Sequence, residues 1–515
     1  MNALNLAAEL VFAKRALDKP CYLGPGYRLD YRELDRAVRR QAAAMIRDSV
    51  TAGDRVVIAL DDGPNLAVLF FAALAIGALP AVVNSRLDRE SLRTILEDAK
   101  PALLYAQVGE AVTVAQALGG LSPAPNARLL ETMWFRDTVL AARDDDDRWD
   151  ATVAVPADAP ALIQYTSGTT GKPKGVMHSG AGVLACCADL CAQLRLGQDD
   201  VLYSVPKMFF GYGMGNSLFF PLYLGASAVL DPAWPTAESV LGNLREFAPT
   251  VLFAVPTLYR MLLEGGLRGE DCKLRLAFSA GAPLPEATAA RWRLRFGFDL
   301  HDGIGATELC HVFATTYPDA LRPGSLGRML PSCKARIVDE HGRDVGPGQI
   351  GVLLVRSPAV AAGYWRRRHE GASRFVDGWY RTGDLFARDD EQYLYFHGRE
   401  DDRFKVFGRW VVPIQVELLI GTHLPELGIC FVVPARDASG EDRPVLCVHG
   451  QPGAEQIERV QALMELRVES HMRPVRVLQL DELPLTANGK PNRRAIAQFA
   501  SRALQPQALE DVSLC

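Results

Sequence analysis

The segment from Tyr165 to His178, YTSGTTGKPKGVMH, is built from the residue types that hold an anion. Its serine, threonine and glycine residues offer backbone N–H and side-chain O–H donors, and Lys172 and Lys174 add positive charge. Glycine accepts positive φ angles, so such a loop can bend tightly around a bound group. We therefore predict a phosphate-binding loop in this segment.

This loop differs from the Walker A motif. That motif needs a Gly-Lys pair followed by serine or threonine, whereas Gly171 and Lys172 are followed here by Pro173. A flexible surface loop is the simplest alternative interpretation. It does not explain the apolar, strand-like run 161–165 (ALIQY) before the loop, or the paired lysines after it. We therefore expect phosphate binding of a kind other than that of the P-loop enzymes.

Four further segments place charged residues in a fixed order after the loop. They are 302–308 (DGIGATE), 380–384 (YRTGD), 398–402 (GREDD) and 484–490 (PLTANGK). Each of them alone is typical of a turn or an exposed loop. In this order, the five segments resemble the motifs of the adenylate-forming superfamily, which holds acyl- and aryl-CoA synthetases, carrier-protein adenylation domains and beetle-type luciferases.

The resemblance implies that ATP and Mg²⁺ bind at these motifs. It assigns Thr307 to the α-phosphate, Glu308 to Mg²⁺ and Asp384 to the ribose hydroxyls of ATP. Mg²⁺ prefers oxygen ligands and takes few of them from the protein, which suits a single carboxylate. The ATP-binding residues that the resemblance implies are Thr166, Ser167, Gly168, Thr169, Thr170, Gly171, Lys174, Asp302, Gly303, Ile304, Thr307, Asp384 and Arg399.

Lys490 is implied as a catalytic residue, together with Thr307 and Glu308. By resemblance, it bridges the carboxylate of the acid substrate and the α-phosphate. Electrostatics supports this role, because the carboxylate must attack an already anionic phosphorus and positive charge must lie between them. The implied reaction gives an acyl-adenylate and pyrophosphate, after which a thiol displaces AMP to form a thioester.

The acid is predicted from a second, narrower resemblance. Residues 207–216 (KMFFGYGMGN) and 219–221 (FFP), with a histidine shortly after Glu308, resemble benzoate-CoA ligases and related aryl-CoA ligases. Flat apolar walls suit an arene, although aromatic clusters also commonly build core. We therefore expect a small aromatic carboxylic acid, bound by Tyr212, Phe220, Gly281, Ile304, Gly305, His311 and Val312.

The implied thiol acceptor is coenzyme A or the phosphopantetheine of a carrier protein. Gly408 matches the glycine that lines the pantetheine channel in relatives, and Arg409 and Trp410 follow it. Several residues depart from the family pattern, and two of them bear on the thiol and acid sites. Phe407 replaces a small residue commonly found before that glycine, and Ala282 stands where aryl-CoA relatives often carry glutamate.

Three other functions remain open at this stage. They are an adenylating enzyme that loads a carrier protein, an aliphatic acyl-CoA synthetase, and a regulatory protein that binds nucleotides without catalysis. The last is disfavoured by the presence of Lys490 and Glu308, since both belong to the chemistry of the reaction.

The composition sets the frame for these sites. A chain of 515 residues exceeds one ordinary core, so two or more domains are expected. The net charge of −5 argues against nucleic acid or an anionic membrane as a partner. The apolar run 66–83 contains Gly77 and Pro80, which favours a buried helix and strand over a membrane span. With no secretion signal and no CxxC spacing, we expect a cytoplasmic enzyme with reduced cysteines.

The elements that must position the motifs alternate between helix and strand. Residues 30–50 are predicted as an amphipathic helix capped by Asp30 and Glu33, 55–60 as a strand and 63–75 as a helix. Further strands at 249–253 and 274–279 continue this alternation. It indicates an α/β fold of helix-wrapped, mostly parallel sheets, with a small β-rich subdomain over 325–355.

A polar stretch divides the predicted domains. We expect an N-terminal domain that binds ATP and the acid over 1–398, a hinge over 399–403 and a C-terminal domain over 404–515. By resemblance, the hinge residue is Asp401, and the small α+β C-terminal domain is a mobile lid that rotates between the two steps of the reaction.

Overall fold

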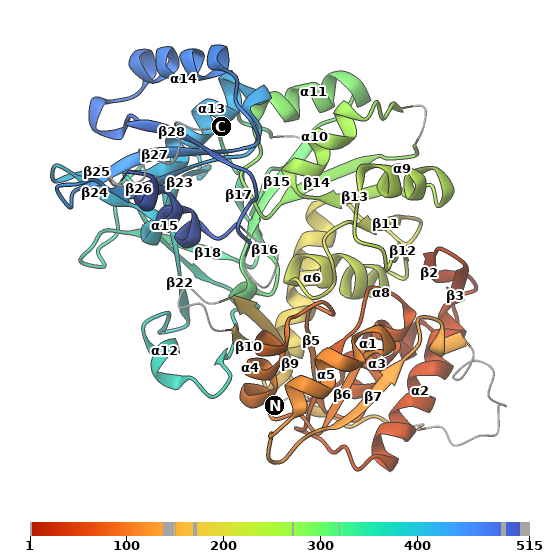
Figure 1. Cartoon of the computed structure of the whole chain (residues 1–515). Coiled ribbons are helices and arrows are strands. Elements are labelled where there is room, and N and C mark those ends of the chain that lie inside the picture. Colours follow the sequence, from red (N-terminus) through yellow and green to blue (C-terminus); the bar gives the residue numbers. More distant parts are fainter. Residues whose placement is uncertain are drawn as a thin grey trace.

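Two large sheets with helices between them form the main body of the chain (Figure 1). The structure is a computed structural model that describes residues 3–136, 149, 151–167, 173–269, 272–318, 320–485 and 491–504. The first sheet is parallel from β9 to β7 and closes with two antiparallel strands. Its order is β20 (Gly363–Tyr364), β10 (Pro173–Ser179), β9 (Pro160–Ser167), β5 (Leu79–Val82), β4 (Arg55–Ala59), β6 (Leu103–Gln107) and β7 (Asn126–Leu130).

The second sheet has a parallel centre and antiparallel edges. Its order is β17 (Arg328–Met329), β16 (Val312–Thr315), β15 (Leu300–Gly305), β14 (Leu276–Ala280), β13 (Val251–Ala254), β11 (Val201–Ser204), β12 (Ser227–Val229), β2 (Pro20–Gly24) and β3 (Tyr27–Asp30). Parallel strands buried on both faces require helices on each side.

The helices form three layers around the two sheets. Between the sheets lie α1 (Leu6–Leu10), α2 (Tyr31–Arg47), α3 (Pro64–Ala75), α6 (Gly180–Gln193) and α8 (Phe220–Leu224), in one core that also takes residues from both sheets. Over the outer face of the first sheet pack α4 (Arg89–Ala99) and α5 (Ala111–Leu118). Over the outer face of the second pack α9 (Ala237–Glu246), α10 (Pro256–Glu264) and α11 (Glu286–Phe296).

Helix α2 shows how the local sequence sets these elements. Asp30 accepts a hydrogen bond of 2.7 Å from the backbone N–H of Glu33, and Glu33 accepts one of 2.9 Å from the N–H of Asp30. This capping box satisfies donors that a helix start leaves free. The helix buries an apolar face that includes Leu34, Val38 and Met45. The predicted helix is confirmed, although it ends at Arg47.

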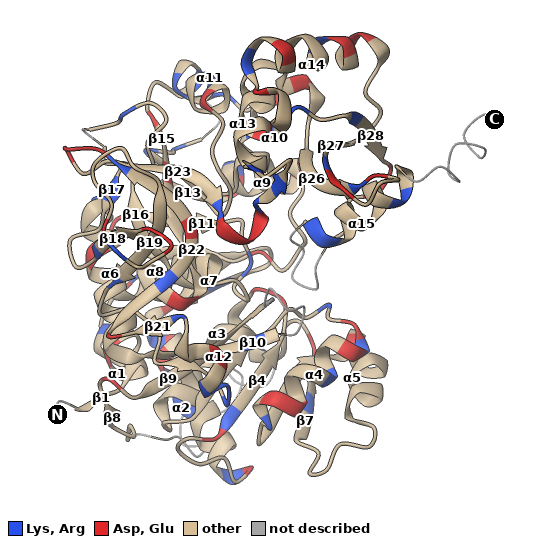
Figure 2. Cartoon of the chain, turned by 90° about the vertical axis from the view of Figure 1, so that its left-hand side faces the viewer, with Lys and Arg blue, Asp and Glu red and all other residues tan. Residues whose placement is uncertain are grey.

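The apolar run 66–83 lies inside the protein. It forms α3, all of whose residues are buried, followed by the buried strand β5. The predicted buried helix and strand are therefore confirmed. None of the helices in the described ranges is long and apolar enough to span a membrane. Basic and acidic residues are interspersed over the view in Figure 2, in line with the small net charge.

A five-stranded antiparallel sheet follows the main body. It contains β18 (Lys334–Val338), β19 (Gly351–Arg356), β21 (Phe375–Val376), β22 (Trp379–Arg388) and β23 (Leu394–Arg399), with β22 paired to β19, β21 and β23. A short helix, α12 (Arg368–Ala372), precedes β21.

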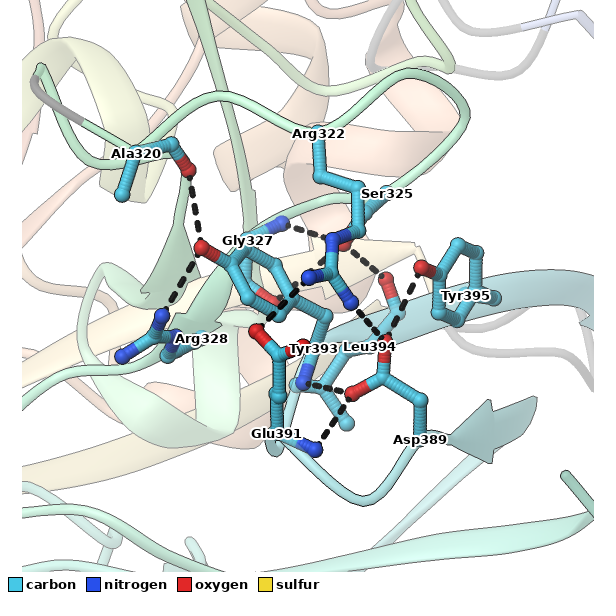
Figure 3. A network of polar contacts seen from close by, with 10 residues as sticks. All are labelled: Ala320, Arg322, Ser325, Gly327, Arg328, Asp389, Glu391, Tyr393, Leu394 and Tyr395. Atoms are coloured by element: carbon cyan, nitrogen blue, oxygen red, sulfur yellow. Dashed lines mark hydrogen bonds and ion pairs between the residues drawn. The ribbon is translucent and has the colours of Figure 1, made fainter. Parts of the chain in front are cut away.

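A polar network joins this sheet to the segment before β17 (Figure 3). Arg322 forms ion pairs with Asp389 and Glu391, and its guanidinium lies 4.1 Å from the centroid of the Tyr393 ring. Asp389 also accepts hydrogen bonds of 3.0 and 2.9 Å from the backbone N–H groups of Glu391 and Tyr393, which orders the turn between β22 and β23. The network therefore fixes where this turn, and the two strands it joins, meet the main body.

The C-terminal domain has its own α+β core. Its sheet contains β26 (Cys430–Arg436), β27 (Asp442–His449) and β28 (Arg476–Leu480), packed by α13 (Pro413–His423), α14 (Ala454–Arg467) and α15 (Arg493–Ala503). A hairpin of β24 (Phe404–Val406) and β25 (Arg409–Val411) precedes it. The predicted fold class, with helix-wrapped and mostly parallel sheets, a β-rich subdomain and a small C-terminal domain, is confirmed.

Candidate active site

One large cavity lies between the main body and the C-terminal domain. Its volume is about 1150 Å³. Residues of β10, of the carboxyl ends of β14 and β15, and of β22 line it from the main body, and residues of α13 and β26 line it from the C-terminal domain. Crevices at the carboxyl ends of parallel strands are the usual place for ligands in α/β folds.

The structure brings most of the described site residues together in this cavity. Those that line it are Thr166, Lys174, Tyr212, Gly281, Gly305, Thr307, Glu308, His311, Val312, Asp384 and Arg399. Phe220, Asp302, Gly303 and Ile304 are not among the described residues that line it. Gly168, Thr169, Thr170, Gly171 and Lys490 lie outside the described residues, as does the side chain of Ser167.

The two strands that flank the predicted phosphate-binding loop contribute residues to one end of the cavity. Thr166 on β9 is directly opposite Lys174 on β10 in the antiparallel pair. The amino group of Lys174 forms an ion pair of 2.8 Å with Glu370, which also lines the cavity. A hydroxyl group and a cation therefore face the same end of the cavity from two adjacent strands.

The motif 302–308 follows β15 to its end and turns at the short helix η6 (Thr307–Leu309). Gly303 packs so closely that an added Cβ would lie 2.6 Å from the Phe278 ring, and one at Gly305 would lie 2.6 Å from the carbonyl oxygen of His311. Burial raises the pKa of Asp302 to about 8, and its carboxyl accepts a hydrogen bond of 3.0 Å from the N–H of Gly303.

The side chain of Glu308 is held in the cavity by Tyr364, whose hydroxyl donates a hydrogen bond of 2.8 Å to it. The backbone of Glu308 accepts another, of 2.9 Å, from the N–H of Ala361. Within the described ranges, no group of three or more His, Cys, Asp or Glu side chains forms a metal-ligand cluster. A single oriented carboxylate still fits Mg²⁺, which takes most of its ligands from phosphate and water.

Asp384 and Arg399 face each other across two paired strands. They are partners in the register of β22 and β23, and their charged groups lie 3.7 Å apart. Burial raises the pKa of Asp384 to about 6, although the nearby Arg399 acts in the opposite direction. The pair thus presents an acceptor and a cation to the cavity.

A wall of aromatic rings closes another part of the cavity. The ring centroids of Tyr212 and His311 lie 5.3 Å apart, and those of Phe220 and His311 lie 4.7 Å apart in an edge-on arrangement. His311 Nε2 lies 3.1 Å from the carbonyl oxygen of Tyr212, which can only accept, so this nitrogen carries the proton. Burial lowers the pKa of His311 to about 4, which keeps the imidazole neutral.

The hairpin of β24 and β25 lies apart from the cavity in this conformation. Gly408, Arg409 and Trp410 are not among the described residues that line it. Phe407 and Gly408 form the turn with φ angles of 50° and 77°. Glycine suits such a turn, and a Cβ added at Gly408 would meet no described atom within 4 Å.

The predicted hinge and the flanks of Lys490 lie close to the cavity. Asp401 is in the short helix η7 (Glu400–Asp402) and forms an ion pair of 3.5 Å with Arg374, which lines the cavity. Leu485 and Pro491, the described residues on either side of the segment 486–490, also line it.

Several cavity residues were missed by the sequence analysis. Tyr364, Glu370 and Arg374 belong to one stretch, 363–376, that carries no recognisable motif. Its run of three arginines is more typical of a solvated surface, so only the aromatic pair of Tyr364 and Trp365 could have drawn attention to it.

Comparisons with known proteins agree with this geometry. The sequence model of the AMP-binding enzyme family matches residues 10–365. The chain is 42% identical to an anthranilate–CoA ligase of Pseudomonas aeruginosa, over 89% of each chain. It is 36% identical to a 4-hydroxybenzoate–CoA/benzoate–CoA ligase of Rhodopseudomonas palustris, over 93% of this chain and 91% of that one.

A solved structure shows the same architecture. The crystal structure of a benzoate CoA ligase from Burkholderia xenovorans LB400 superposes with a TM-score of 0.87 and 29% identity, over 96% of this chain and 100% of that one. The fold and the site define an adenylate-forming protein, as the motifs predicted. The chain belongs to the family of AMP-binding enzymes.

Proposed function

We propose that this protein is an ATP-dependent aryl-CoA ligase that activates a benzoate-like acid as an acyl-adenylate and transfers it to coenzyme A. One observation carries the proposal. One cavity is lined by Lys174, by the carboxylate of Glu308, by the ion pair of Asp384 and Arg399, and by the aromatic rings of Tyr212 and His311. The relatives named above act on aromatic acids and are CoA ligases, which supports both the acid and the acceptor.

The cavity divides into regions with different chemistry. Lys174 and Thr166 offer a cation and a hydroxyl to the β- and γ-phosphates of ATP, continuing the loop that starts after β9. Asp384 accepts hydrogen bonds from the ribose hydroxyls, beside Arg399. Asp302, Gly303 and Ile304 belong to β15, and we place the adenine against this strand.

The first step takes place where these regions meet. We assign Thr307 to the α-phosphate, and we assign to Lys490 the role of bridging the α-phosphate and the carboxylate of the acid, where a cation balances the charge that develops. Glu308 would hold Mg²⁺, which supplies further charge neutralisation at the phosphates when bound. Leu485 and Pro491 support the assignment of Lys490, since both of these described flanking residues line the cavity.

The aromatic ring of the acid lies against the wall built around His311. Tyr212, His311 and Val312 give it apolar and edge-on contacts, and Gly281 and Gly305 leave room for it. Phe220 packs behind this wall, edge-on to His311, and supports it without lining the cavity. Because His311 is neutral and donates to Tyr212, it adds no charge to this wall. A neutral wall favours an uncharged arene over a second carboxylate on the ring.

The second step requires a different arrangement of the C-terminal domain. We assign residues 1–398 to the N-terminal domain, 399–403 to the hinge and 404–515 to the lid. Rotation at Asp401 would withdraw Lys490 and bring Gly408, Arg409 and Trp410 to the cavity as the pantetheine channel. Their place outside the cavity supports the view that the present conformation belongs to the first step.

A two-stage assay tests the proposal. Pyrophosphate release is first measured with ATP, Mg²⁺ and a panel of benzoate derivatives and medium-chain acids. Thioester formation is then compared between free CoA and a phosphopantetheinyl carrier protein. We expect release with aromatic acids and thioester with CoA. Release with no aromatic acid, or thioester on the carrier alone, would contradict the proposal.

A further inference from the structure

The amino group of Lys174 has an acidic partner inside the cavity. Its Nζ lies 2.8 Å from Oε2 of Glu370. The lysine side chain is only 13% exposed, whereas that of Glu370 is 44% exposed, so the carboxylate reaches in from the solvent side. Lys174, which follows the predicted phosphate-binding loop, is therefore already paired with a carboxylate of the chain itself.

Glu370 is held in this place from a second direction. It lies in the short helix α12, close to β10 (Figure 1), and Arg367 one residue before that helix anchors it there. Arg367 donates a hydrogen bond of 2.9 Å to the carbonyl oxygen of Pro173 and lies 3.5 Å from Oε1 of Glu370. Arg367 also lies 3.6 Å from Asp98, which ties it to the main body.

The carboxylate is an anion at neutral pH. Its hydrogen bond and ion pair with Lys174 hold the pKa of Glu370 below its usual value. A triphosphate that reaches the same lysine brings several negative charges to this spot. The two anions repel each other and compete for the same ammonium group.

We propose that Glu370 is an internal competitor for the phosphate-binding lysine. Its carboxylate pairs with Lys174 when no nucleotide is bound, gives way when the β- and γ-phosphates of ATP arrive, and takes the lysine back as pyrophosphate leaves. Glu370 thus weakens the binding of pyrophosphate and hastens its release. This inference rests on the proposed function, because it requires that ATP binds in this cavity.

Two other roles for Glu370 make different predictions. If the carboxylate held a phosphate-bound cation, its loss would weaken the binding of ATP. If the pair served only to fasten α12 to β10, its loss would lower the thermal stability and leave the phosphate affinity unchanged.

Isothermal titration calorimetry separates these roles. Inorganic pyrophosphate, ATP and AMP are each titrated into the wild-type protein and the Glu370→Gln variant, in the absence of acid. We expect pyrophosphate and ATP to bind about 3- to 10-fold more tightly to the variant, as one nearby like charge is removed. AMP lacks the β- and γ-phosphates, so its affinity should not change.

Two further variants serve as controls. Glu370→Asp keeps the charge and should bind pyrophosphate nearly as the wild type does. Glu340→Gln removes an exposed carboxylate that does not line the cavity, and should leave all three affinities unchanged. Thermal unfolding of each variant reports whether the fold is intact.

The outcomes are distinct. Pyrophosphate binding that is unchanged or weaker in a folded Glu370→Gln variant overturns the inference. If the wild-type protein binds neither ATP nor pyrophosphate and releases no pyrophosphate with aromatic acids, the proposed function itself fails. If the wild-type protein is active and the Glu370→Gln variant binds pyrophosphate with unchanged affinity, the proposed function is retained and only the proposed role of Glu370 is rejected.

Discussion

Tyr364 donates a hydrogen bond of 2.8 Å from its hydroxyl group to Oε1 of Glu308. Tyr364 lies on β20, which is paired with β10, whereas Glu308 lies on η6 beyond the end of β15. The bond therefore joins the edge of the first sheet to the strand end of the second. Burial raises the pKa of Tyr364, so its hydroxyl keeps the proton that it donates.

Removal of that hydroxyl should impair the use of Mg²⁺. In Tyr364→Phe, the carboxylate of Glu308 loses one hydrogen bond and is less well oriented. A hydrogen bond to a charged group is worth about 1.5–3 kcal/mol, so we expect a loss of about 10- to 100-fold in pyrophosphate release at low Mg²⁺. A Mg²⁺ titration of the rate measures it, with partial recovery expected at high Mg²⁺.

The matched control is Tyr395→Phe. The Tyr395 hydroxyl also donates to a carboxylate, Asp389, at 3.1 Å (Figure 3). Neither of these two residues lines the cavity. The control should keep the wild-type dependence on Mg²⁺. Equal effects of the two substitutions would show that Tyr364 acts through general stability.

The kcat/KM for ATP should fall at mildly acidic pH because of the carboxyl group of Asp384. Burial raises the pKa of this carboxyl to about 6, so it is ionised above that pH and protonated below it. Only the ionised form accepts hydrogen bonds from both ribose hydroxyls with full strength. We therefore expect kcat/KM for ATP to fall as the pH drops through about 6.

The variant Asp384→Asn identifies the group responsible. Its kcat/KM for ATP should be lower at neutral pH and should lack the inflection near pH 6. The profile is measured at saturating acid, since the aromatic acid is itself ionised across this range. An unchanged inflection in the variant would assign the titration to another group.

The binding of the aromatic acid should be sensitive to Gly215. A Cβ added there would lie 2.4 Å from Cδ2 of His311 and 2.9 Å from its Nε2, so the ring must move and its bond to Tyr212 is lost. Overpacking of this kind costs about 1–3 kcal/mol. In Gly215→Ala we expect KM for the acid to rise about tenfold, with KM for ATP unchanged.

Gly242→Ala is the control for that substitution. Gly242 is in α9, and a Cβ there would meet no described atom within 4 Å. Steady-state kinetics with a panel of acids measures both variants. A smaller acid should be affected less than a substituted benzoate. An equal rise in KM for the acid and in KM for ATP would contradict the assignment of this wall to the acid.

Much of this fold could be predicted from the sequence because its signals are local. The helix α2 follows from its capping box and the spacing of its apolar residues, and α3 with β5 follows from an uncharged run broken by Gly77 and Pro80. The cavity-lining set was predicted largely through motifs, since Glu308, Asp384 and Arg399 each stand in a short segment with a recognisable order.

The contacts that motifs could not predict join distant segments. Glu308 and Tyr364 are 56 residues apart in the sequence, and the pair of Lys174 and Glu370 joins β10 to a helix of five residues. Neither Tyr364 nor Glu370 stands in a pattern that indicates its partner. Such pairs arise only when β20 packs against β10, which is a property of the tertiary structure.

The relative rates of acyl-adenylate formation and of transfer to CoA should depend on Arg381. Its guanidinium lies 2.9 and 3.2 Å from the two oxygens of Glu400, so it ties β22 to the predicted hinge in the conformation seen here. Neither residue lines the cavity, and both are partly exposed. Exposed ion pairs contribute up to about 1 kcal/mol, which corresponds to a shift of up to about fivefold between two conformations.

In Arg381→Gln the present conformation loses this tie. We expect acyl-adenylate formation to slow by up to about fivefold and the transfer from preformed acyl-adenylate to CoA to keep or increase its rate. Single-turnover measurements of the two steps give both rates. Arg336→Gln, which removes an exposed ion pair to Asp344 within the β-rich subdomain, should change neither. A bias toward one conformation must favour one step at the expense of the other. If the rates of both steps fall together in Arg381→Gln, the ion pair therefore supports the fold and does not select between the two conformations.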